Sequence, residues 1–252
     1  MSDFWNEFDE AYRLFSQYCD TNDWHRILES IAGAVAATKP ASGSALTVLD
    51  VGCGNAVATQ TICEQVFAAT GWFPQLGVVE PSIIARERLY GHLLVSSTGG
   101  PMELAAKSIE AIPANRQFDA IVFVHSTYYV AHLADQLQVL VDVHLAPSGA
   151  VIVLALPRYS PFFLGLPPLP HCADEVHMIL SRMGLRVESY QLRSRFRLPT
   201  QVSAVQWEHL MRFMAPHVSD LTSFQALVKQ FLCKARVADF GDHLLVGRRT
   251  AS

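Results

Sequence analysis

Alternating strand-like and helix-like segments run through the middle of the chain and predict an open α/β sheet. Segments typical of buried strands cover residues 46–51, 75–80, 102–106, 118–124 and 149–156, and segments with helical periodicity cover 56–69, 82–94 and 132–145. The strands are apolar on both faces, as a parallel sheet covered by helices on both sides requires. In such sheets ligands bind beyond the carboxyl ends of the strands, so the functional residues are expected there.

Helical patterns flank this core at both ends of the chain. Residues 3–19 and 22–38 predict two helices, which makes residues 1–44 an N-terminal helical cap before a domain at 45–199. After a proline-rich loop at 157–170, the pattern predicts a helix at 171–183, a strand at 185–193, amphipathic helices near 203–214 and 220–234, and a strand at 243–248. We therefore expect residues 200–235 to form a helical insertion that acts as a lid together with the cap, and residues 236–252 to supply the final strand.

Composition and charge narrow the class of partner. Half of the 252 residues are hydrophobic and 17% are charged, so the chain can fold around a sizeable core. The net charge is −4, and the alternating Arg193, Arg195 and Arg197 are typical of a solvated strand edge rather than a phosphate-binding patch. These features predict no nucleic-acid partner, and they leave the oligomeric state open.

Cysteine usage and the N-terminal sequence indicate a soluble cytoplasmic protein. The five cysteines are scattered without a C-x-x-C pair, which is typical of a reducing compartment. The first residues lack the basic and apolar regions of a signal peptide, and the longest apolar run, 150–157, is too short to cross a bilayer. The spacing of His171, Cys172, Asp174 and His177 does not favour a metal site, so we expect neither a metal nor a membrane partner.

Residues 48–56 read Val-Leu-Asp-Val-Gly-Cys-Gly-Asn-Ala and join a predicted strand to a predicted helix. Gly52 and Gly54 let the backbone turn tightly and approach a ligand closely, because no Cβ intervenes. Glu80 ends the next strand, where an acid can accept both hydroxyls of a ribose. The pair predicts a site for a nucleoside-containing cofactor; the alternative is a plain strand–helix turn with Glu80 as a helix cap.

The loop matches neither the dinucleotide fingerprint nor the phosphate-binding loop. The sixth position of G-x-G-x-x-G is Val57, and no G-x-x-x-x-G-K-[ST] segment occurs. The acid Asp50 before the loop, with small Asn55 and Ala56 after it, suits a ligand that carries an ammonium group and no pyrophosphate.

Together with later segments, these residues resemble the class I S-adenosylmethionine-dependent methyltransferases. The match runs in family order over roughly residues 45–156 and comprises Leu49–Ala56, Glu80, Ile109–Pro113, Phe118–Phe123 and Leu145–Val153. The resemblance implies a Rossmann-like, mostly parallel seven-stranded sheet with helices on both faces. The chain departs from the family at Ala56, where a third glycine is usual, and at Ser108, where an adenine-binding acid is often found.

The resemblance also implies a cofactor, S-adenosyl-L-methionine, with S-adenosyl-L-homocysteine as the product. The backbone at Gly52 and Gly54 would lie along the methionine part of the cofactor, and Asp50 would orient its amine. Glu80 would accept hydrogen bonds from the ribose hydroxyls. The cofactor-binding positions that it implies are Asp50, Gly52, Cys53, Gly54, Glu80, Pro81, Ser108, Ile109 and His125.

His125 directly follows the strand at 118–124, beside the place where the reacting methyl group would lie. Its side chain could take a proton from the methyl acceptor or hydrogen-bond to it, because imidazole exchanges protons near neutral pH. The alternative is a histidine that caps the next helix or packs under the lid. The aromatic and acidic residues of the N-terminal cap could attract a cationic amine, although an amphipathic helix with a buried aromatic face has the same pattern.

A narrower resemblance points to the histamine N-methyltransferase branch, through Val78–Ser82, Tyr128–Val130 and Glu10–Phe15. It implies that Glu10 binds the acceptor and that Tyr12, Tyr128, Tyr129 and Asp239 are further substrate contacts. The pocket glutamine of that branch falls on His125, and its C-terminal asparagine falls near Asp239. Because two of three polar pocket positions differ, the resemblance keeps a small, nitrogenous and partly aromatic acceptor without supporting histamine itself.

The sequence therefore predicts S-adenosylmethionine-dependent methyl transfer to a small molecule, with N-methylation of an amine or N-heterocycle as the leading hypothesis. His125 and Glu10 are the expected catalytic residues. Two alternatives stay open: O-methylation of a hydroxyl or carboxylate with His125 as the base, and a non-catalytic methyltransferase-like module that binds the cofactor or a partner protein.

Overall fold

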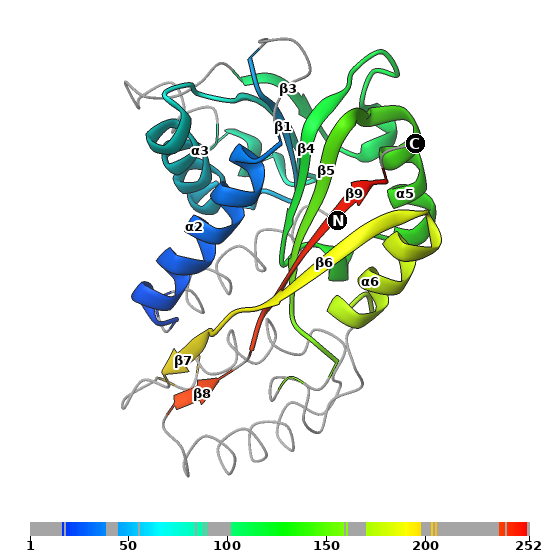
Figure 1. Ribbon diagram of the computed structural model, residues 1–252. Helices are drawn as coiled ribbons and strands as arrows, with labels where there is room; N and C mark the ends of the chain where they lie inside the picture. The colour runs from blue at the N-terminus through cyan, green and yellow to red at the C-terminus, as the bar shows by residue number, and fades with distance from the viewer. Residues whose placement is uncertain are drawn as a thin grey trace.

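A seven-stranded, mostly parallel sheet forms the centre of the molecule, which confirms the predicted fold class (Figure 1). The computed structural model describes residues 17, 19–38, 45–54, 56–83, 85–87, 89, 102–158, 160, 170–197, 203, 205, 237–239 and 241–250. The strand order is β3-β2-β1-β4-β5-β9-β6. Their bounds are β1 Thr47–Val51, β2 Gln75–Val79, β3 Met102–Ala106, β4 Phe118–Val124, β5 Leu145–Ala155, β6 Leu185–Gln191 and β9 His243–Arg249. Within this sheet β9 runs antiparallel to β5 and β6, and the pairs from β3 to β5 are parallel.

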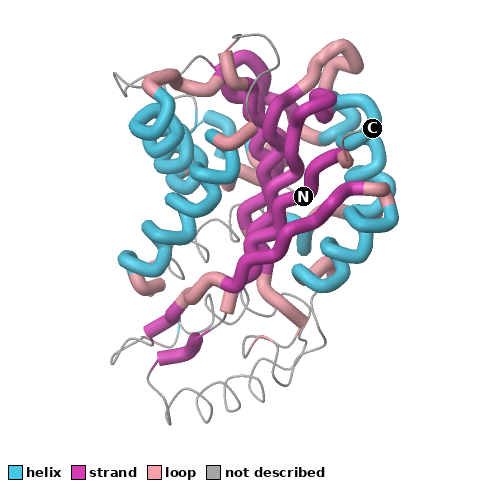
Figure 2. The backbone as a smooth tube through the Cα atoms, in the orientation of Figure 1, coloured by secondary structure: helices cyan, strands magenta, loops and turns pink. Residues whose placement is uncertain are grey.

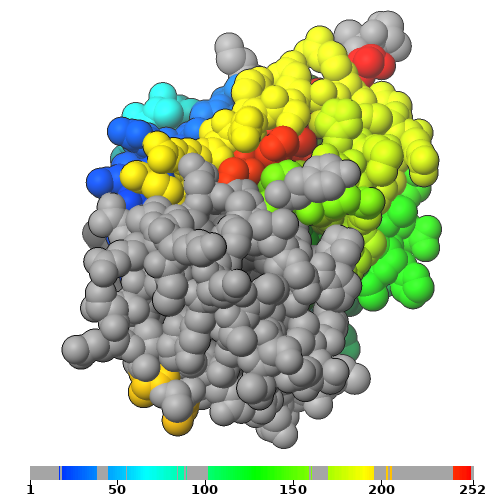
Figure 3. All heavy atoms as spheres, turned by 90° about the horizontal axis from the view of Figure 1, so that it is seen from below, coloured from blue at the N-terminus to red at the C-terminus, as the bar shows by residue number. Residues whose placement is uncertain are grey.

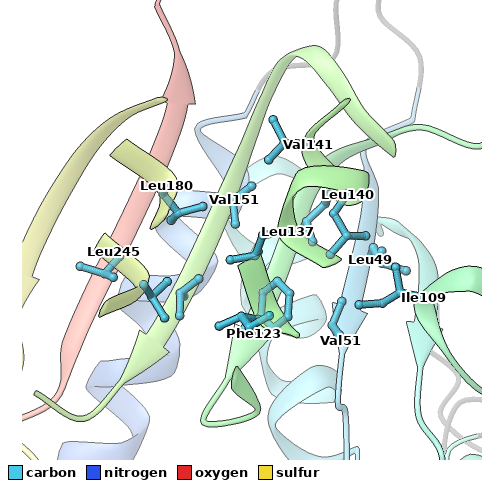
Figure 4. Close-up of a cluster of buried hydrophobic side chains, with 14 of the residues drawn as sticks. Leu49, Val51, Ile109, Phe123, Leu137, Leu140, Val141, Val151, Leu180 and Leu245 are labelled. Carbon is cyan, nitrogen blue, oxygen red and sulfur yellow. The ribbon is translucent and has the colours of Figure 1, made fainter. Parts of the chain in front are cut away.

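Helices cover both faces of this sheet, as the apolar strands predict (Figure 2). Helices α2 (Thr21–Ala36) and α3 (Val57–Thr70) lie on one face, and α5 (Leu133–Val139) and α6 (Ala173–Arg182) lie on the other. Alternate residues of β5 divide between the two layers: Val151 and Val153 pack with α5 and α6, whereas Ile152 and Leu154 pack with α2 and α3. Figure 4 shows the first of these clusters. Burial on both faces holds the strand ends rigidly and so fixes the loops that carry the site.

Helix α2 begins at a side-chain cap close to the predicted position. Asp20 accepts hydrogen bonds from the backbone N–H groups of Asn22 and Asp23, which have no partners within the helix. The preceding helix was predicted to extend to residue 19, but residue 17 is in a turn and Cys19 forms an isolated β-bridge. The rest of that predicted helix lies outside the described residues.

The connection between β4 and β5 differs from the prediction. The helix expected at 132–145 ends at Val139 and continues as a π-helical segment, Leu140–His144. Strand β5 then begins at Leu145 rather than 149, since Phe118 pairs with Leu145 while Ala120 pairs with Ala150. This register irregularity absorbs the Ala-Pro-Ser segment at 146–148, which the sequence pattern leaves between the predicted helix and strand.

A two-stranded antiparallel sheet, β7 (Arg195–Arg197) with β8 (Val237–Asp239), lies beside the start of α2 and was not predicted (Figure 1). Arg195 is also not the solvated edge residue that we expected, because its guanidinium contacts Asp23 at 2.6 and 2.9 Å. The predicted helical insertion, apart from residues 203 and 205, lies outside the described residues, and so does most of the helix predicted at 82–94. No helix in the described part of the chain is long and apolar enough to span a membrane.

Candidate active site

The predicted cofactor residues meet at the carboxyl edge of the sheet, where the direction of the strand order reverses. β1 lies between β2 and β4, and the helices that follow β1 and β4, α3 and α5, cover opposite faces. Gly52 follows β1, Glu80 follows β2 and His125 follows β4. Such a switch point leaves a crevice between two diverging loops, which is the usual ligand position in open α/β sheets.

The glycine loop requires glycine at one position for space and at another for conformation. Gly52 has a φ of +82°, and its N–H donates to the Val79 carbonyl at 2.7 Å. A Cβ on Gly52 would lie only 2.5 Å from the Cβ of Ser126, so the close approach of the two loops depends on its absence. Gly54 has a φ of +53°, but among the described residues no heavy atom outside its chain neighbours lies within 4 Å of the position that a Cβ would occupy.

Ala56, where the family usually has a third glycine, keeps a glycine-like backbone. It is buried, it has a φ of +66°, and it stands at the N-cap of α3 without a side-chain cap. The left-handed conformation costs a non-glycine residue about 1–2 kcal/mol. The departure from the family pattern therefore leaves the conformation of the loop intact.

Asp50 is a buried carboxylate with one oxygen occupied. Thr59 Oγ1, on α3, donates to Oδ2 at 2.5 Å, while Oδ1 has no hydrogen-bond partner among the described residues. Burial raises the pKa of Asp50 to about 7; the Thr59 bond opposes the rise and the nearby Glu80 adds to it. A buried carboxylate oxygen without a partner is suited to a cationic ligand group.

Glu80 ties the two loops of the cofactor crevice together. Its Oε2 accepts the N–H of Gly54 at 3.0 Å and its Oε1 accepts the N–H of Ser82 at 2.9 Å. The side chain of Arg86 donates to the Glu80 backbone carbonyl. Glu80 is buried, at 5% exposure. Since each carboxylate oxygen can accept more than one hydrogen bond, this geometry leaves Glu80 able to bind ligand hydroxyls.

The remaining predicted cofactor positions are divided between core and surface. Cys53 and Ile109 are buried, whereas Pro81 is exposed. Burial raises the pKa of the Cys53 thiol well above its usual range, and the charges of Asp50 and Glu80 add to this rise. Ser108 begins the 3-10 turn Ile109–Ala111, and its hydrogen bond to the Glu110 carboxylate contributes to the lowered pKa of that group, after a backbone bond.

His125 stands directly beyond β4 in a left-handed backbone conformation, with a φ of +52°. Its N–H donates to the Leu154 carbonyl at 2.9 Å, which fixes the residue between β4 and β5. The imidazole is 27% exposed and stacks against the indole of Trp24, with ring centroids 6.1 Å apart and planes 20° apart. Non-glycine residues held at positive φ are uncommon and concentrate at functional sites.

Two side chains face the ring nitrogens of His125. Nε2 lies 3.4 Å from Oδ1 of Asp242, a carboxylate that is 2% exposed, and Nδ1 lies 3.4 Å from the Tyr128 hydroxyl. Tyr128 Oη in turn accepts the N–H of Leu156 at 2.5 Å. The site therefore contains a continuous chain from a buried carboxylate through an imidazole to a buried phenol.

The predicted substrate contacts are placed only in part. Tyr128 is buried behind His125, and Tyr129 packs edge-on against it with centroids 6.1 Å apart. Glu10, Tyr12 and the side chain of Asp239 lie outside the described residues, so their roles stay predictions.

The cluster at 171–177, considered for metal binding in the sequence, is engaged in other contacts. Asp174 accepts the N–H of Arg158 at 2.7 Å, and the N–H of His171 donates to Glu175 at 2.6 Å. Within the described ranges, no three His, Cys, Asp or Glu side chains are grouped so that they could hold a metal ion.

A family model described as a methyltransferase domain matches residues 23–230, a span that includes the sheet from β1 to β6, the glycine loop and His125. The chain belongs to this methyltransferase family. It is an S-adenosylmethionine-dependent methyltransferase. Comparison with curated protein sequences gives no match.

Several solved structures share the fold of this methyltransferase at low sequence identity. The N-methyltransferase NodS from Bradyrhizobium japonicum WM9, in complex with S-adenosyl-L-homocysteine, is 16% identical over 98% of this chain and 100% of that chain, with a TM-score of 0.58. The magnesium protoporphyrin IX methyltransferase ChlM from Synechocystis PCC 6803, with bound S-adenosylmethionine, is 9% identical over 90% and 80%, with a TM-score of 0.52. The [4+2]-cyclase SpnF is 13% identical over 90% and 81%, with a TM-score of 0.60. At these identities the likeness establishes the fold alone.

The crevice of the methyltransferase fits S-adenosylmethionine at both ends. The buried Oδ1 of Asp50, for which the described residues offer no hydrogen-bond partner, suits the ammonium of the methionine part, and Glu80 suits the ribose hydroxyls. When bound, the cofactor supplies an electrophilic methyl group on a sulfonium. The protein's own task is then to align the acceptor and, where the acceptor carries an extra proton, to remove it.

Three side chains of the methyltransferase site were missed in the sequence: Trp24, Thr59 and Asp242. Thr59 could have been found, since it is placed on the first turn of the helix that follows the glycine loop. Asp242 directly precedes the last strand, three positions after the predicted Asp239. Trp24 carries no sequence signal, because its contact with His125 arises only from the tertiary fold.

Proposed function

We propose that this methyltransferase methylates a nitrogen of a small molecule, an amine or an N-heterocycle, with His125 as the proton acceptor. The observation that carries the proposal is the 3.4 Å pairing of His125 with the buried carboxylate of Asp242 beside the glycine loop. A buried negative charge and the aromatic face of Trp24 favour an acceptor that arrives with positive charge. Such an acceptor must lose a proton before its nitrogen can attack the methyl group.

The fixed backbone of His125 suits this role. Its N–H bond to Leu154 and the stacking on Trp24 hold the ring in place before the acceptor binds. Alignment of the acceptor within about 3–3.5 Å of the methyl carbon would supply most of the rate enhancement. Proton removal by a positioned base would add roughly 10²–10⁴-fold.

The comparisons support nitrogen without deciding the acceptor. NodS, which is described as an N-methyltransferase, matches this chain over nearly its whole length. SpnF, which is described as a cyclase, has the same fold, so the fold by itself does not name the reaction. Within this proposal Glu10 and Tyr12 bind the acceptor from the N-terminal cap.

The cysteines described as free support a reducing compartment such as the cytoplasm.

Mass spectrometry of the products from a panel of amines, imidazoles, phenols and carboxylates tests the proposal. We expect N-methyl products, and we expect His125→Ala to lower turnover by roughly 10²–10⁴-fold at neutral pH. Raising the pH until the free amine predominates should restore much of the lost rate. His132→Ala is a matched control, because His132 also has a positive φ, +51°, and is exposed.

Each contrary outcome supports a specific alternative. Methylated phenols or acids without methylated amines would overturn the assignment of nitrogen and support O-methylation. Cofactor binding without turnover of any acceptor would support a non-catalytic binding module.

A further inference from the structure

We propose that Asp242 is a positioning residue, which holds the proton of the His125 ring on Nε2 and thereby makes Nδ1 the atom that accepts the proton of the substrate. The proposal rests on the proposed function of His125 as the proton acceptor. Its structural part, the state of the His125 ring, can be measured without any substrate.

The fold places Asp242 at the site through β9. Ala155 at the end of β5 pairs with His243 at the start of β9, so Asp242 emerges at the carboxyl edge of the sheet. Its backbone carbonyl accepts the N–H of Leu192 at 2.7 Å, which joins the segment after β6 to this point. In the view from below, red surface of the C-terminal segment lies beside yellow surface of the chain before residue 200 (Figure 3).

The carboxylate of Asp242 needs a positive partner. It is 2% exposed, and its Oδ1 receives no hydrogen bond of ordinary geometry from the described residues. An uncompensated buried charge is costly. The His125 contact meets the distance of an ion pair but not the angles of a hydrogen bond, so its attraction is electrostatic.

The other groups that feel this charge cannot neutralise it. Burial, and then the charge of Asp242, raise the pKa of the Cys19 thiol to about 12. Burial also raises the pKa of Tyr128 above its usual value, against the bond from Leu156 and with a further contribution from Asp242. Both therefore stay neutral at physiological pH. Among the described residues, His125 is the side chain that can carry a positive charge within ion-pair distance of Asp242.

The charge of Asp242 selects one tautomer of His125. A carboxylate next to Nε2 favours the ring form with its hydrogen on Nε2, because the other form would set a nitrogen lone pair against the negative charge. The lone pair of a neutral ring then lies on Nδ1, 3.4 Å from Tyr128 Oη. Tyr128 Oη already accepts the Leu156 N–H and has a second lone pair, so it can also accept a hydrogen bond from Nδ1 once that nitrogen has taken up a proton, with the hydroxyl hydrogen turned away from the ring.

The proton balance of the reaction follows from this arrangement. The proton leaves the acceptor nitrogen for Nδ1, and the electron pair left on nitrogen forms the new C–N bond while the electrons of the broken C–S bond stay on sulfur. The resulting imidazolium keeps its Nε2 hydrogen next to Asp242. The buried negative charge then compensates the new positive charge, as in other histidine–carboxylate pairs.

Long-range ¹H–¹⁵N correlation spectra of protein labelled at histidine test the structural part directly. We expect His125 of the wild type to show the Nε2–H form and Asp242→Asn to show a mixture of both forms. Asp119→Asn is a matched control, because Asp119 is also buried but binds Thr47 at the opposite edge of the sheet. An Nδ1–H form in the wild type would overturn the proposal whether or not the variants fold.

Kinetics test the catalytic part. We expect Asp242→Asn to lower kcat about 100-fold while the cofactor KM stays within about twofold. The double variant, His125→Ala with Asp242→Asn, should have the same kcat as His125→Ala alone, because Asp242 acts through His125. Additive losses, or an Asp242→Asn enzyme with normal kcat, would overturn the positioning role. Normal activity of His125→Ala together with the Nε2–H form in the spectra would instead refute the proposed function and leave the pairing intact.

Discussion

Gly52 lies against Ser126 so closely that a Cβ on the glycine would come within 2.5 Å of the serine Cβ and 3.2 Å of its Oγ. Gly52→Ala therefore has to strain a backbone with a φ of +82° and also push the two loops apart. We expect it to destabilise the protein by about 2–4 kcal/mol and to abolish measurable cofactor binding. Urea unfolding and calorimetric titration measure the two effects.

Gly54→Ala is the control for that prediction. Its φ of +53° carries the same conformational penalty, but no other part of the described chain comes within 4 Å of the added methyl group. We expect a loss of about 1–2 kcal/mol from backbone strain alone. Equal effects of the two substitutions would show that the contact with Ser126 has no importance.

Asp50 should make the stability of the cofactor-free protein depend on pH. Folding raises its pKa from 3.8 to about 7, so the folded state holds the proton more tightly than the unfolded state. The stabilisation is complete below about pH 4 and is lost as the pH rises through 7. Urea unfolding measures the difference in unfolding free energy between Asp50→Asn and the wild type at each pH. We expect this difference to favour the variant more at pH 8 than at pH 5. An unchanged difference between these pH values would contradict this.

Asp50 should also couple cofactor binding to proton release. An ammonium next to Oδ1 favours the ionised carboxylate, so binding at pH 7 should release roughly half a proton. Calorimetric titration in buffers with different ionisation enthalpies measures this number. Affinity should fall as the pH drops below 7, and Asp50→Asn should abolish both effects. Binding that takes up protons at pH 7 would refute this role of Asp50.

Arg195 and Asp23 join β7 to the start of α2 across 172 positions of sequence. Asp23 is 4% exposed and Arg195 is 27% exposed, so removal of the arginine leaves a largely buried carboxylate without its partner. We expect Arg195→Ala to cost about 2–3 kcal/mol and to weaken acceptor binding, because the next residue, Trp24, stacks on His125. Urea unfolding and the acceptor KM test this.

An exposed ion pair serves as the control for Arg195. Arg186 and Glu188 lie 3.4 Å apart on the surface of β6, and Arg186→Ala should change stability by less than about 0.5 kcal/mol. The Arg195 bond lowers the pKa of Asp23, so the contribution of the pair should be present near neutral pH and be lost as the pH falls through that lowered value. If the Arg195→Ala and Arg186→Ala proteins were equally stable, the Arg195–Asp23 ion pair would have no special role in stability.

The central sheet could be predicted from the sequence because its signals are local. Strands β3 and β4 fall on their predicted ranges, since apolar runs bounded by turn residues define them. The start of β5 could not be predicted, because its bulge depends on pairing with β4. The small β7–β8 sheet joins segments forty residues apart, so no local pattern announces it.

The site divides in the same way. Gly52, Glu80 and His125 could be predicted because each follows a strand whose carboxyl end marks the crevice. Asp242 and Trp24 could not, because their contacts with His125 depend on an antiparallel strand and on a helix that precedes the sheet in sequence. The Arg195–Asp23 ion pair was missed because alternating arginines on a strand predict solvent-exposed side chains unless the opposing carboxylate is known.

Calorimetric titration of S-adenosylmethionine and S-adenosylhomocysteine into wild type, Glu80→Ala, Glu80→Gln and Glu87→Ala tests the cofactor site most directly. Glu80 anchors the Gly54 and Ser82 loops with both oxygens, whereas Glu87 is exposed on the following helix. We expect the Kd to rise about 100-fold in Glu80→Ala and about 10-fold in Glu80→Gln, since charge-assisted hydrogen bonds are worth about 1.5–3 kcal/mol, and to stay unchanged in Glu87→Ala. A wild type that binds neither ligand, or a Glu80→Ala variant that binds as tightly as the wild type, would contradict the account.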